Sequence, residues 1–161
     1  EQVKDLVITH LALRMVSQGS VPLVLCLVGK PGVGKTSICQ NIAKALDKKV
    51  YRISLAGSHT QSDIVGHNRA YVNATEGKIL RALKTTKSAS PVIILDEVDK
   101  MGTENAWHGS PADALLHALD PEQNNAFFDD YLGTPFDISR VLFIATANNE
   151  REIPQALRDR M

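Results

Sequence analysis

A glycine-rich run near the N-terminus constrains this chain more than any other feature. Residues Gly29–Thr36 read GKPGVGKT and fit the pattern G-x-x-x-x-G-K-[ST], which is typical of a phosphate-binding loop. The apolar stretch 21–28 before the run predicts a buried strand, and the residues after it, as far as Leu46, predict a helix. The pattern binds phosphate in this strand–loop–helix order. We therefore predict an α/β fold of the P-loop NTPase class.

The residues of the run suit the phosphates of a nucleotide. Its glycines let the backbone curl so that successive N–H groups point at phosphate oxygens, and the helix N-terminus adds positive partial charge. Lys35 is expected to reach the β- and γ-phosphates, and the Thr36 hydroxyl to bind Mg²⁺. The predicted nucleotide-binding residues are Gly29, Lys30, Pro31, Gly32, Val33, Gly34, Lys35, Thr36 and Ser37.

Wholly apolar strands that alternate with helical patterns predict a parallel sheet covered by helices on both faces. The expected strands are 21–28, 50–55, 92–95 and 141–145. The expected helices are 1–18, 36–46, 78–85, 111–119 and 154–160, together with a brief one near Ser62. Ligands of such sheets lie beyond the carboxyl ends of the strands. We therefore expect the glycine-rich run, Asp96-Glu97 and Asn148 to meet at one edge.

Polar residues at that edge can perform phosphoryl transfer to water. Asp96 is expected to hold Mg²⁺ through its water shell, and Glu97 to orient and polarise the attacking water as a base. Their alternative role is to cap a strand edge in solvent. Asn148 could hold the water or the γ-phosphate, or could simply form a turn. Arg158 and Arg160 are candidates for the cation that stabilises the spreading charge, and a solvated helix face is the alternative.

Two glycine-flanked loops carry large apolar side chains. Tyr71-Val72 lies between Gly66 and Gly77, and Trp107 lies in 102–109. Such side chains either anchor a loop to the core or contact another chain.

Composition limits the other functional classes to which the protein could belong. The chain of 161 residues is about the length of one domain, and its net charge of zero gives no sign of nucleic-acid binding. No apolar run is long enough to span a bilayer. The two cysteines, Cys26 and Cys39, suggest core thiols in a reducing compartment rather than a metal site or disulfide. We expect an intracellular, soluble protein, and both ends look cut from a longer chain.

The motifs together resemble the ATPase module of Lon-type proteases. The resemblance covers nearly the whole chain. It rests on Cys26–Ser37 (CLVGKPGVGKTS), Leu95–Met101 (LDEVDKM), Leu119–Asn124 (LDPEQN), Ala145–Asn148 (ATAN), Tyr131-Leu132, Pro135–Asp137 (PFD), Ile153-Pro154 and Leu157–Met161 (LRDRM). The phosphate loop is shared by many ATPases, whereas the LDPEQN and PFD runs are much more specific to this family.

The resemblance implies a function. Residues 1–161 would be the large AAA+ subdomain, and the small helical subdomain and the Ser-Lys protease domain would lie after Met161. The family assembles as a hexamer and uses ATP and Mg²⁺ to pull unfolded or damaged proteins into a proteolytic chamber. The alternatives are an AAA+ chaperone or remodeller without protease, and a scaffold whose assembly ATP controls. The family occurs in bacterial cytoplasm, mitochondrial matrix and peroxisome, which the sequence does not separate.

Matching motifs carry family roles onto this chain. Lys35 and Thr36 match Walker A, Asp96 and Glu97 match Walker B, Asn148 matches sensor 1, and Arg160 matches the arginine finger that acts on a neighbour's ATP. Tyr71-Val72 matches the substrate-gripping pore loop, and Trp107 falls near the second pore loop. The family usually reads YVGAMPG in the first pore loop, and this chain reads YVNATEG. Replacing a glycine by Asn73 and a proline by Glu76 is expected to change the stiffness of that loop.

Overall fold

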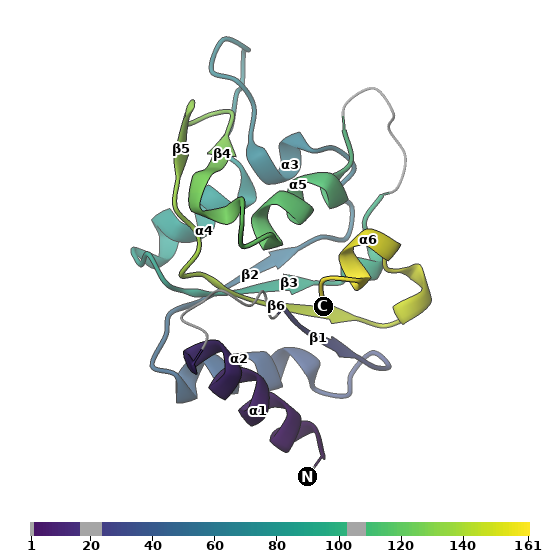
Figure 1. Cartoon of the computed structure of the whole chain (residues 1–161). Helices are drawn as coiled ribbons and strands as arrows, with labels where there is room; N and C mark the ends of the chain where they lie inside the picture. The colour runs from purple at the N-terminus through teal and green to yellow at the C-terminus, as the bar shows by residue number, and fades with distance from the viewer. Residues whose placement is uncertain (1, 17–23, 103–108) are drawn as a thin grey trace.

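A four-stranded parallel sheet forms the centre of the protein. The computed structural model describes residues 2–16, 24–102 and 109–161. The strands are β1 (Leu25–Val28), β2 (Val50–Ser54), β3 (Val92–Asp96) and β6 (Leu142–Ala147), in the order β1-β6-β3-β2 (Figure 1). All three neighbouring pairs are parallel, so the carboxyl ends lie at one edge. This arrangement confirms the predicted fold class.

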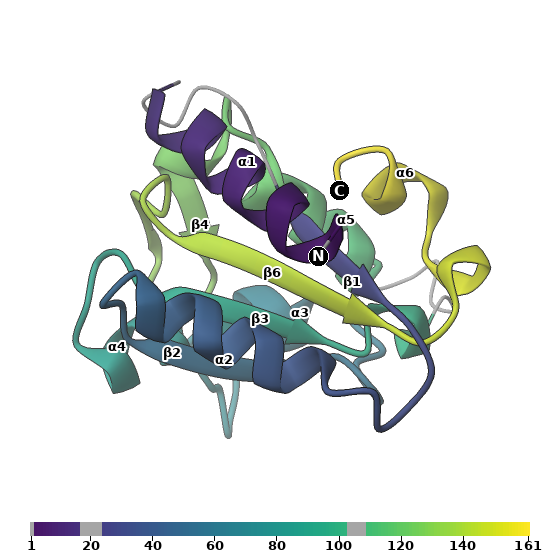
Figure 2. The same ribbon diagram turned by 90° about the horizontal axis from the view of Figure 1, so that it is seen from below.

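Two helices, α1 (Gln2–Val16) and α2 (Lys35–Ala45), cover one face of the sheet (Figure 2). The core of this layer consists of Val7, Leu25, Cys39, Ile42, Ala43, Val92, Ile94, Leu142 and Ile144. Successive strand residues point to opposite faces, so in β3 Val92 and Ile94 belong to this layer and Ile93 and Leu95 to the other. This is why β3 is apolar throughout before it ends at Asp96.

The opposite face is covered by a larger layer. It contains α3 (Ser62–Val65), α4 (Lys78–Thr86), α5 (Pro111–Leu119), α6 (Gln155–Arg158) and the antiparallel hairpin of β4 (Phe127–Asp129) and β5 (Thr134–Phe136) (Figure 1). The rings of Phe127 and Phe136 meet edge to face across the hairpin, with centroids 5.7 Å apart. Short 3-10 helices at Val98–Lys100, Asn124–Ala126 and Glu150–Glu152 complete the connections.

Most predicted elements are present, with small shifts at their ends. The α5 helix has the predicted limits, and its N-cap Ser110 accepts the N–H of Ala112 at 3.1 Å. The first strand begins at Leu25, because the described residue before it, Val24, is not part of a strand, and residues 21–23 lie outside the described part of the chain. The hairpin was not predicted, because its strands are only three residues long and Pro135 interrupts the strand pattern. Within the described residues, no helix is long and apolar enough to cross a membrane.

Candidate functional site

The glycine-rich loop leaves β1 and turns into α2, and its backbone N–H groups near the start of the helix are unused. Gly32 and Gly34 have φ of +81° and +91°, and an added Cβ at either would meet nothing within 4 Å. Among the described residues, the N–H groups from Gly32 to Ser37 donate no hydrogen bond. Free donors at the start of a helix form an anion-binding site. At the other end of the loop, Gly29 N–H donates to Ala147 O at 3.1 Å, which fixes the loop to the end of β6.

The Lys35 side chain folds back over this loop. Its Nζ lies 2.6 Å from Gly29 O, 3.1 Å from Lys30 O and 2.9 Å from the side-chain oxygen of Asn148. The last contact joins two of the predicted site residues across 113 positions of sequence. The amine therefore lies between the loop and the end of β6, where a phosphate could replace its present partners.

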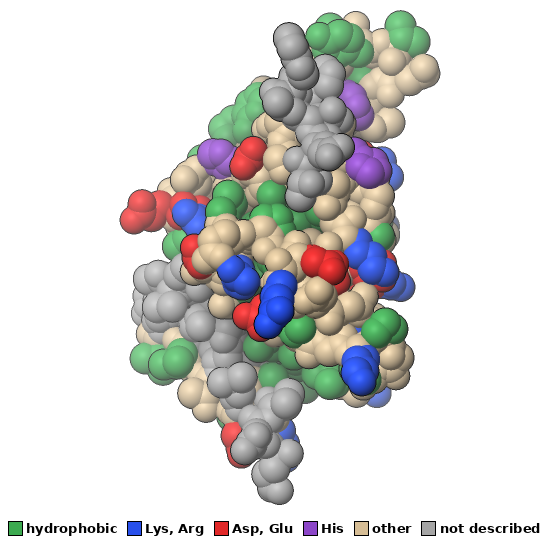
Figure 3. Space-filling model, turned by 90° about the vertical axis from the view of Figure 1, so that its right-hand side faces the viewer, with side chains coloured by type: hydrophobic (Ala, Val, Ile, Leu, Met, Phe, Trp, Pro, Cys, Tyr) green, Lys and Arg blue, Asp and Glu red, His purple; other side chains and the backbone are tan. Residues whose placement is uncertain are grey.

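A pocket of about 370 Å³ opens at the carboxyl edge of the sheet. Its lining is Pro31, Gly32, Gly34, Lys35, Thr36, Ser37, Arg52, Asp96, Glu97, Lys100, Thr146 and Asn148. The three polar clusters expected to converge thus lie in one pocket. Seen from this side, lysine and arginine side chains lie beside acidic ones across the middle of the face (Figure 3). Of the other predicted loop residues, Lys30 and Val33 are exposed.

Asp96 is buried at the end of β3, and both its carboxylate oxygens have partners. The Thr146 hydroxyl donates to Oδ1, while Arg52 Nε donates to Oδ2 at 2.6 Å and its Nη2 pairs with the same oxygen. Thr146 also accepts the backbone N–H of Glu97 at 3.2 Å. The hydroxyl of Thr146 therefore orients both acidic residues from the neighbouring strand.

Glu97 turns out of the strand in an unusual conformation. Its φ of 60° and ψ of 50° lie in the left-handed region, which a residue without a special role seldom adopts. Its Oε1 accepts a hydrogen bond from Lys100 Nζ at 3.0 Å, and this bond raises the pKa of Lys100. Glu97 therefore lines the pocket together with Asp96.

Asn148 is held by a buried acid. Asp99 Oδ2 accepts the backbone N–H groups of Asn148 and Asn149 at 3.0 and 3.1 Å. These two bonds fix the chain where it leaves β6, so that the Asn148 amide faces Lys35. Asp99 is thus a positioning residue that the sequence pattern did not single out.

Arg160 lies outside the pocket. Its Nη1 is 2.9 Å from Asp120 Oδ2, and its side chain remains 38% exposed. The partner comes from the LDPEQN run, which links that specific motif to the predicted arginine finger. Arg158 instead hydrogen-bonds to Gln155 within α6. Neither arginine reaches the phosphate loop of its own chain.

The Tyr71-Val72 pair projects into solvent. Tyr71 is 71% exposed and Val72 is 91% exposed, so neither anchors the loop to the core. Asn73, in place of a family glycine, has φ of +66°, a conformation that asparagine adopts more easily than other side chains. Glu76, in place of the proline, pairs with Lys84 and Arg81 of α4. Trp107 lies outside the described residues.

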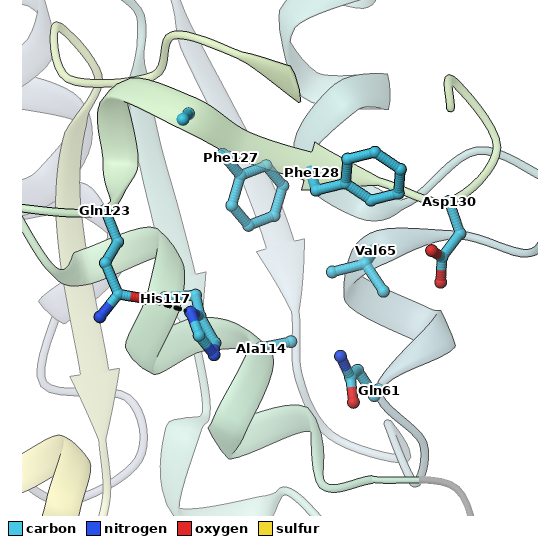
Figure 4. A pocket seen from close by; sticks show the side chains of 9 residues that line it. Gln61, Val65, Ala114, His117, Gln123, Phe127, Phe128 and Asp130 are labelled. Carbon is cyan, nitrogen blue, oxygen red and sulfur yellow. Dashed lines mark hydrogen bonds between the residues drawn. The ribbon is translucent and has the colours of Figure 1, made fainter. Parts of the chain in front are cut away.

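A second pocket, of about 230 Å³, lies between α3, α5 and β4 (Figure 4). These elements belong to the layer that covers the face of the sheet opposite α1 and α2. Phe127 and Phe128 line it together with His117, whose Nδ1 hydrogen-bonds to Gln123. It shares no lining residue with the pocket at the carboxyl edge. Among the described residues, its lining includes no lysine, arginine or glycine, so it is not the candidate phosphate site.

The residues of the first pocket fit a nucleotide with Mg²⁺. The loop supplies free N–H donors, Lys35 supplies a cation, and Thr36 and Asp96 supply oxygen ligands. The described residues include no group of three or more His, Cys, Asp or Glu that could hold a metal. A Mg²⁺ ion here would depend on phosphate oxygens and water for its remaining ligands, as is common for this ion.

Sequence reasoning missed three residues of the pocket: Arg52, Lys100 and Thr146. Arg52 interrupts an otherwise strand-like segment, and a charged residue in the middle of a strand of a covered sheet is the signal that could have found it. Thr146 is one residue past the predicted end of its strand. Lys100 gives no such signal, because it belongs to a short charged run.

Comparisons with known proteins agree with this geometry. The profile of the ATPase family associated with various cellular activities (AAA) matches residues 25–161. The chain is 51% identical to a Lon protease of Dictyoglomus thermophilum and 52% identical to one of Chloroflexus aggregans, over its whole length. It is 48% identical to "Lon protease homolog, mitochondrial 1" of Dictyostelium discoideum. The chain spans 20%, 19% and 17% of these three relatives, about a fifth of their length.

Proposed function

Because the chain belongs to the AAA family of ATPases and is an AAA module of the Lon type, we propose that it powers an ATP-dependent protease. In this proposal residues 1–161 form the large nucleotide-binding subdomain, which binds ATP with Mg²⁺ and hydrolyses it. The observation that carries the proposal is the pocket in which Lys35, Asp96, Glu97 and Asn148 meet around a glycine loop with free N–H donors.

Binding uses the loop and its lysine. The N–H groups from Gly32 to Ser37 and the start of α2 would hold the phosphates, and Lys35 would exchange its carbonyl partners for phosphate oxygens. Thr36 and Asp96 would hold Mg²⁺, which neutralises charge on the phosphates when bound. Each of these groups is already at the mouth or wall of one pocket.

Hydrolysis requires a water aligned with the γ-phosphate. Glu97 would accept a proton from that water, and the Asn148 amide would hold it or the γ-phosphate in place. Arg160, at 38% exposure, would act on the nucleotide of a neighbouring subunit. In this role Arg160 would not need to reach its own phosphate loop, and its contact with Asp120 would hold it at the surface of the module.

The work done by the whole protein is also a proposal. We infer that ring-forming subunits, six by family resemblance, move unfolded or damaged proteins toward a protease chamber. Tyr71 and Val72 would grip the substrate, since an exposed aromatic–aliphatic pair can pack on polypeptides of many sequences.

The test uses the full-length natural protein and an unfolded test protein. Degradation is followed with ATP, without ATP, and with Lys35→Ala and Glu97→Gln variants. Lys35→Ala is expected to abolish nucleotide binding, whereas Glu97→Gln retains binding and loses turnover. Unchanged ATP hydrolysis in Glu97→Gln would refute the assignment of the base. ATP hydrolysis without any cleavage would instead favour a remodeller or a scaffold.

A further inference from the structure

Arg52 and Asp96 form an ion pair that crosses two neighbouring strands. In the register of β2 and β3, Arg52 lies opposite Ile94, and Asp96 lies two residues further along. The arginine side chain therefore runs along the sheet toward the carboxyl edge. Its Nε and Nη2 both meet Asp96 Oδ2, while Thr146 occupies Oδ1.

The Arg52 guanidinium occupies Asp96 Oδ2, the carboxylate oxygen to which Mg²⁺ or its water shell would bind. The Asp96 side chain is only 7% exposed, and a buried carboxylate is costly unless a cation or several donors accompany it. Arg52 is 56% exposed and reaches Asp96 from the pocket side. A guanidinium and a hydrated Mg²⁺ both require space and negative charge at Oδ2, and two cations there would repel each other.

We propose that Arg52 is a positioning residue that neutralises Asp96 in the metal-free site and competes with Mg²⁺ for it. Arg52 thereby sets how strongly nucleotide binding depends on Mg²⁺. The inference rests on the proposed function, because it takes the pocket to be the nucleotide site. It goes beyond that function, because it assigns a role to a side chain that no motif contains.

The expected effect of removing the Arg52 guanidinium is a change in how nucleotide affinity depends on Mg²⁺. Without Mg²⁺, removing the guanidinium leaves Asp96 uncompensated near the phosphates, so nucleotide binding weakens. With Mg²⁺, Asp96 is free to hold the metal, so less Mg²⁺ is needed. The ratio of the Kd measured in EDTA to the Kd measured in saturating Mg²⁺ should therefore rise by roughly tenfold in Arg52→Gln.

The experiment titrates a fluorescent, non-hydrolysable ATP analogue into the full-length natural protein at a series of Mg²⁺ concentrations, so no turnover is measured. Arg140→Gln is the matched control, because it removes an exposed arginine outside the pocket. Arg52→Lys keeps the charge with fewer donors and should fall between wild type and Arg52→Gln. It also provides the measurement if Arg52→Gln does not fold, which a thermal melt would reveal.

A double variant isolates the pair. In an Asp96→Asn background the metal no longer gains a carboxylate, so Arg52→Gln should leave the ratio almost unchanged. The inference is overturned if Arg52→Gln and wild type have the same ratio, or if Arg140→Gln changes the ratio equally. Failure of the wild type to bind the analogue, with no effect of Lys35→Ala, would refute the nucleotide site itself and is readily told apart.

Discussion

The backbone N–H of Gly77 donates a 2.9 Å hydrogen bond to the buried carboxylate of Asp129, 52 residues later in the chain. The other oxygen of Asp129 accepts the N–H groups of Tyr131 and Leu132, each at 3.0 Å. Burial raises the pKa of Asp129, against the lowering effect of these three donors. One carboxylate thus joins the base of the Tyr71-Val72 loop to the turn of the β4–β5 hairpin.

Gly77→Ala is expected to destabilise the fold, because there is no room for a side chain at this contact. A Cβ would lie 2.1 Å from Ile64 O and 2.6 Å from Asp129 Oδ2. Such overpacking costs about 1–3 kcal/mol in the free energy of unfolding. Denaturant unfolding measures the loss. Gly133→Ala is the control, since nothing lies within 4 Å of its added Cβ and only the cost of its positive φ remains. Equal losses at both glycines would contradict the clash.

Asn73, which stands where the family usually has glycine, allows a test of the conformation of the first pore loop. Its φ of +66° is easy for asparagine or glycine and costly for a β-branched side chain. Asn73→Gly should therefore leave protein degradation by the full-length protein within about twofold, whereas Asn73→Val should slow it severalfold. ATP hydrolysis without substrate is the control and should be unaffected in both variants. Equal degradation by both variants would mean that the loop conformation does not matter.

The Asp120–Arg160 pair gives a prediction about the arginine. The backbone N–H of Glu122 and the Arg160 guanidinium hold the pKa of Asp120 below its usual range. The Asp120 carboxylate is therefore charged at every pH above the ordinary pKa of an aspartate. Its pair with Arg160 weakens only as the pH falls through the lowered pKa. Asp120→Ala should reduce ATP turnover severalfold between pH 6 and 8 without changing nucleotide affinity.

Arg160→Ala is the reference for that measurement. Loss of an arginine finger lowers turnover on the order of 10³-fold. If Asp120→Ala leaves turnover at the wild-type level while Arg160→Ala abolishes it, then Asp120 does not position the arginine.

The site at the carboxyl edge was predictable, because the topology of a parallel sheet determines where the residues that follow its strands lie. Apolar strands that alternate with helices give a parallel sheet, and the residues that follow its strands meet at one edge, as Lys35 and Asn148 do. The contact from Arg52 to Asp96 was not predictable, because periodicity does not say which long side chain crosses to a neighbouring strand. The hairpin was missed for a different reason. Three-residue strands are too short for a period to be visible, and their stability comes from Asp129 and the Phe127 ring.

The two cysteines give a prediction that does not depend on the proposed function. Burial raises the pKa of both Cys26 and Cys39 from 9.0 to about 11. At pH 8 the thiolate fraction is then about 100-fold lower than for an ordinary cysteine, so alkylation by iodoacetamide should be slow. Peptide mass spectrometry measures the rate at each residue, and the urea-unfolded protein provides the control.

The same shift predicts how stability changes in alkali. In the unfolded chain the thiols lose their protons near pH 9, whereas in the folded chain they keep them to about pH 11. The raised pKa therefore contributes stability that is complete below pH 9 and is lost as pH rises to 11. Cys39→Ala should remove part of this loss, since Cys39 is fully buried in α2. A free energy of unfolding with the same pH dependence in wild type and Cys39→Ala, or rapid alkylation of native Cys39 at pH 8, would show that the thiol is not held protonated by the core.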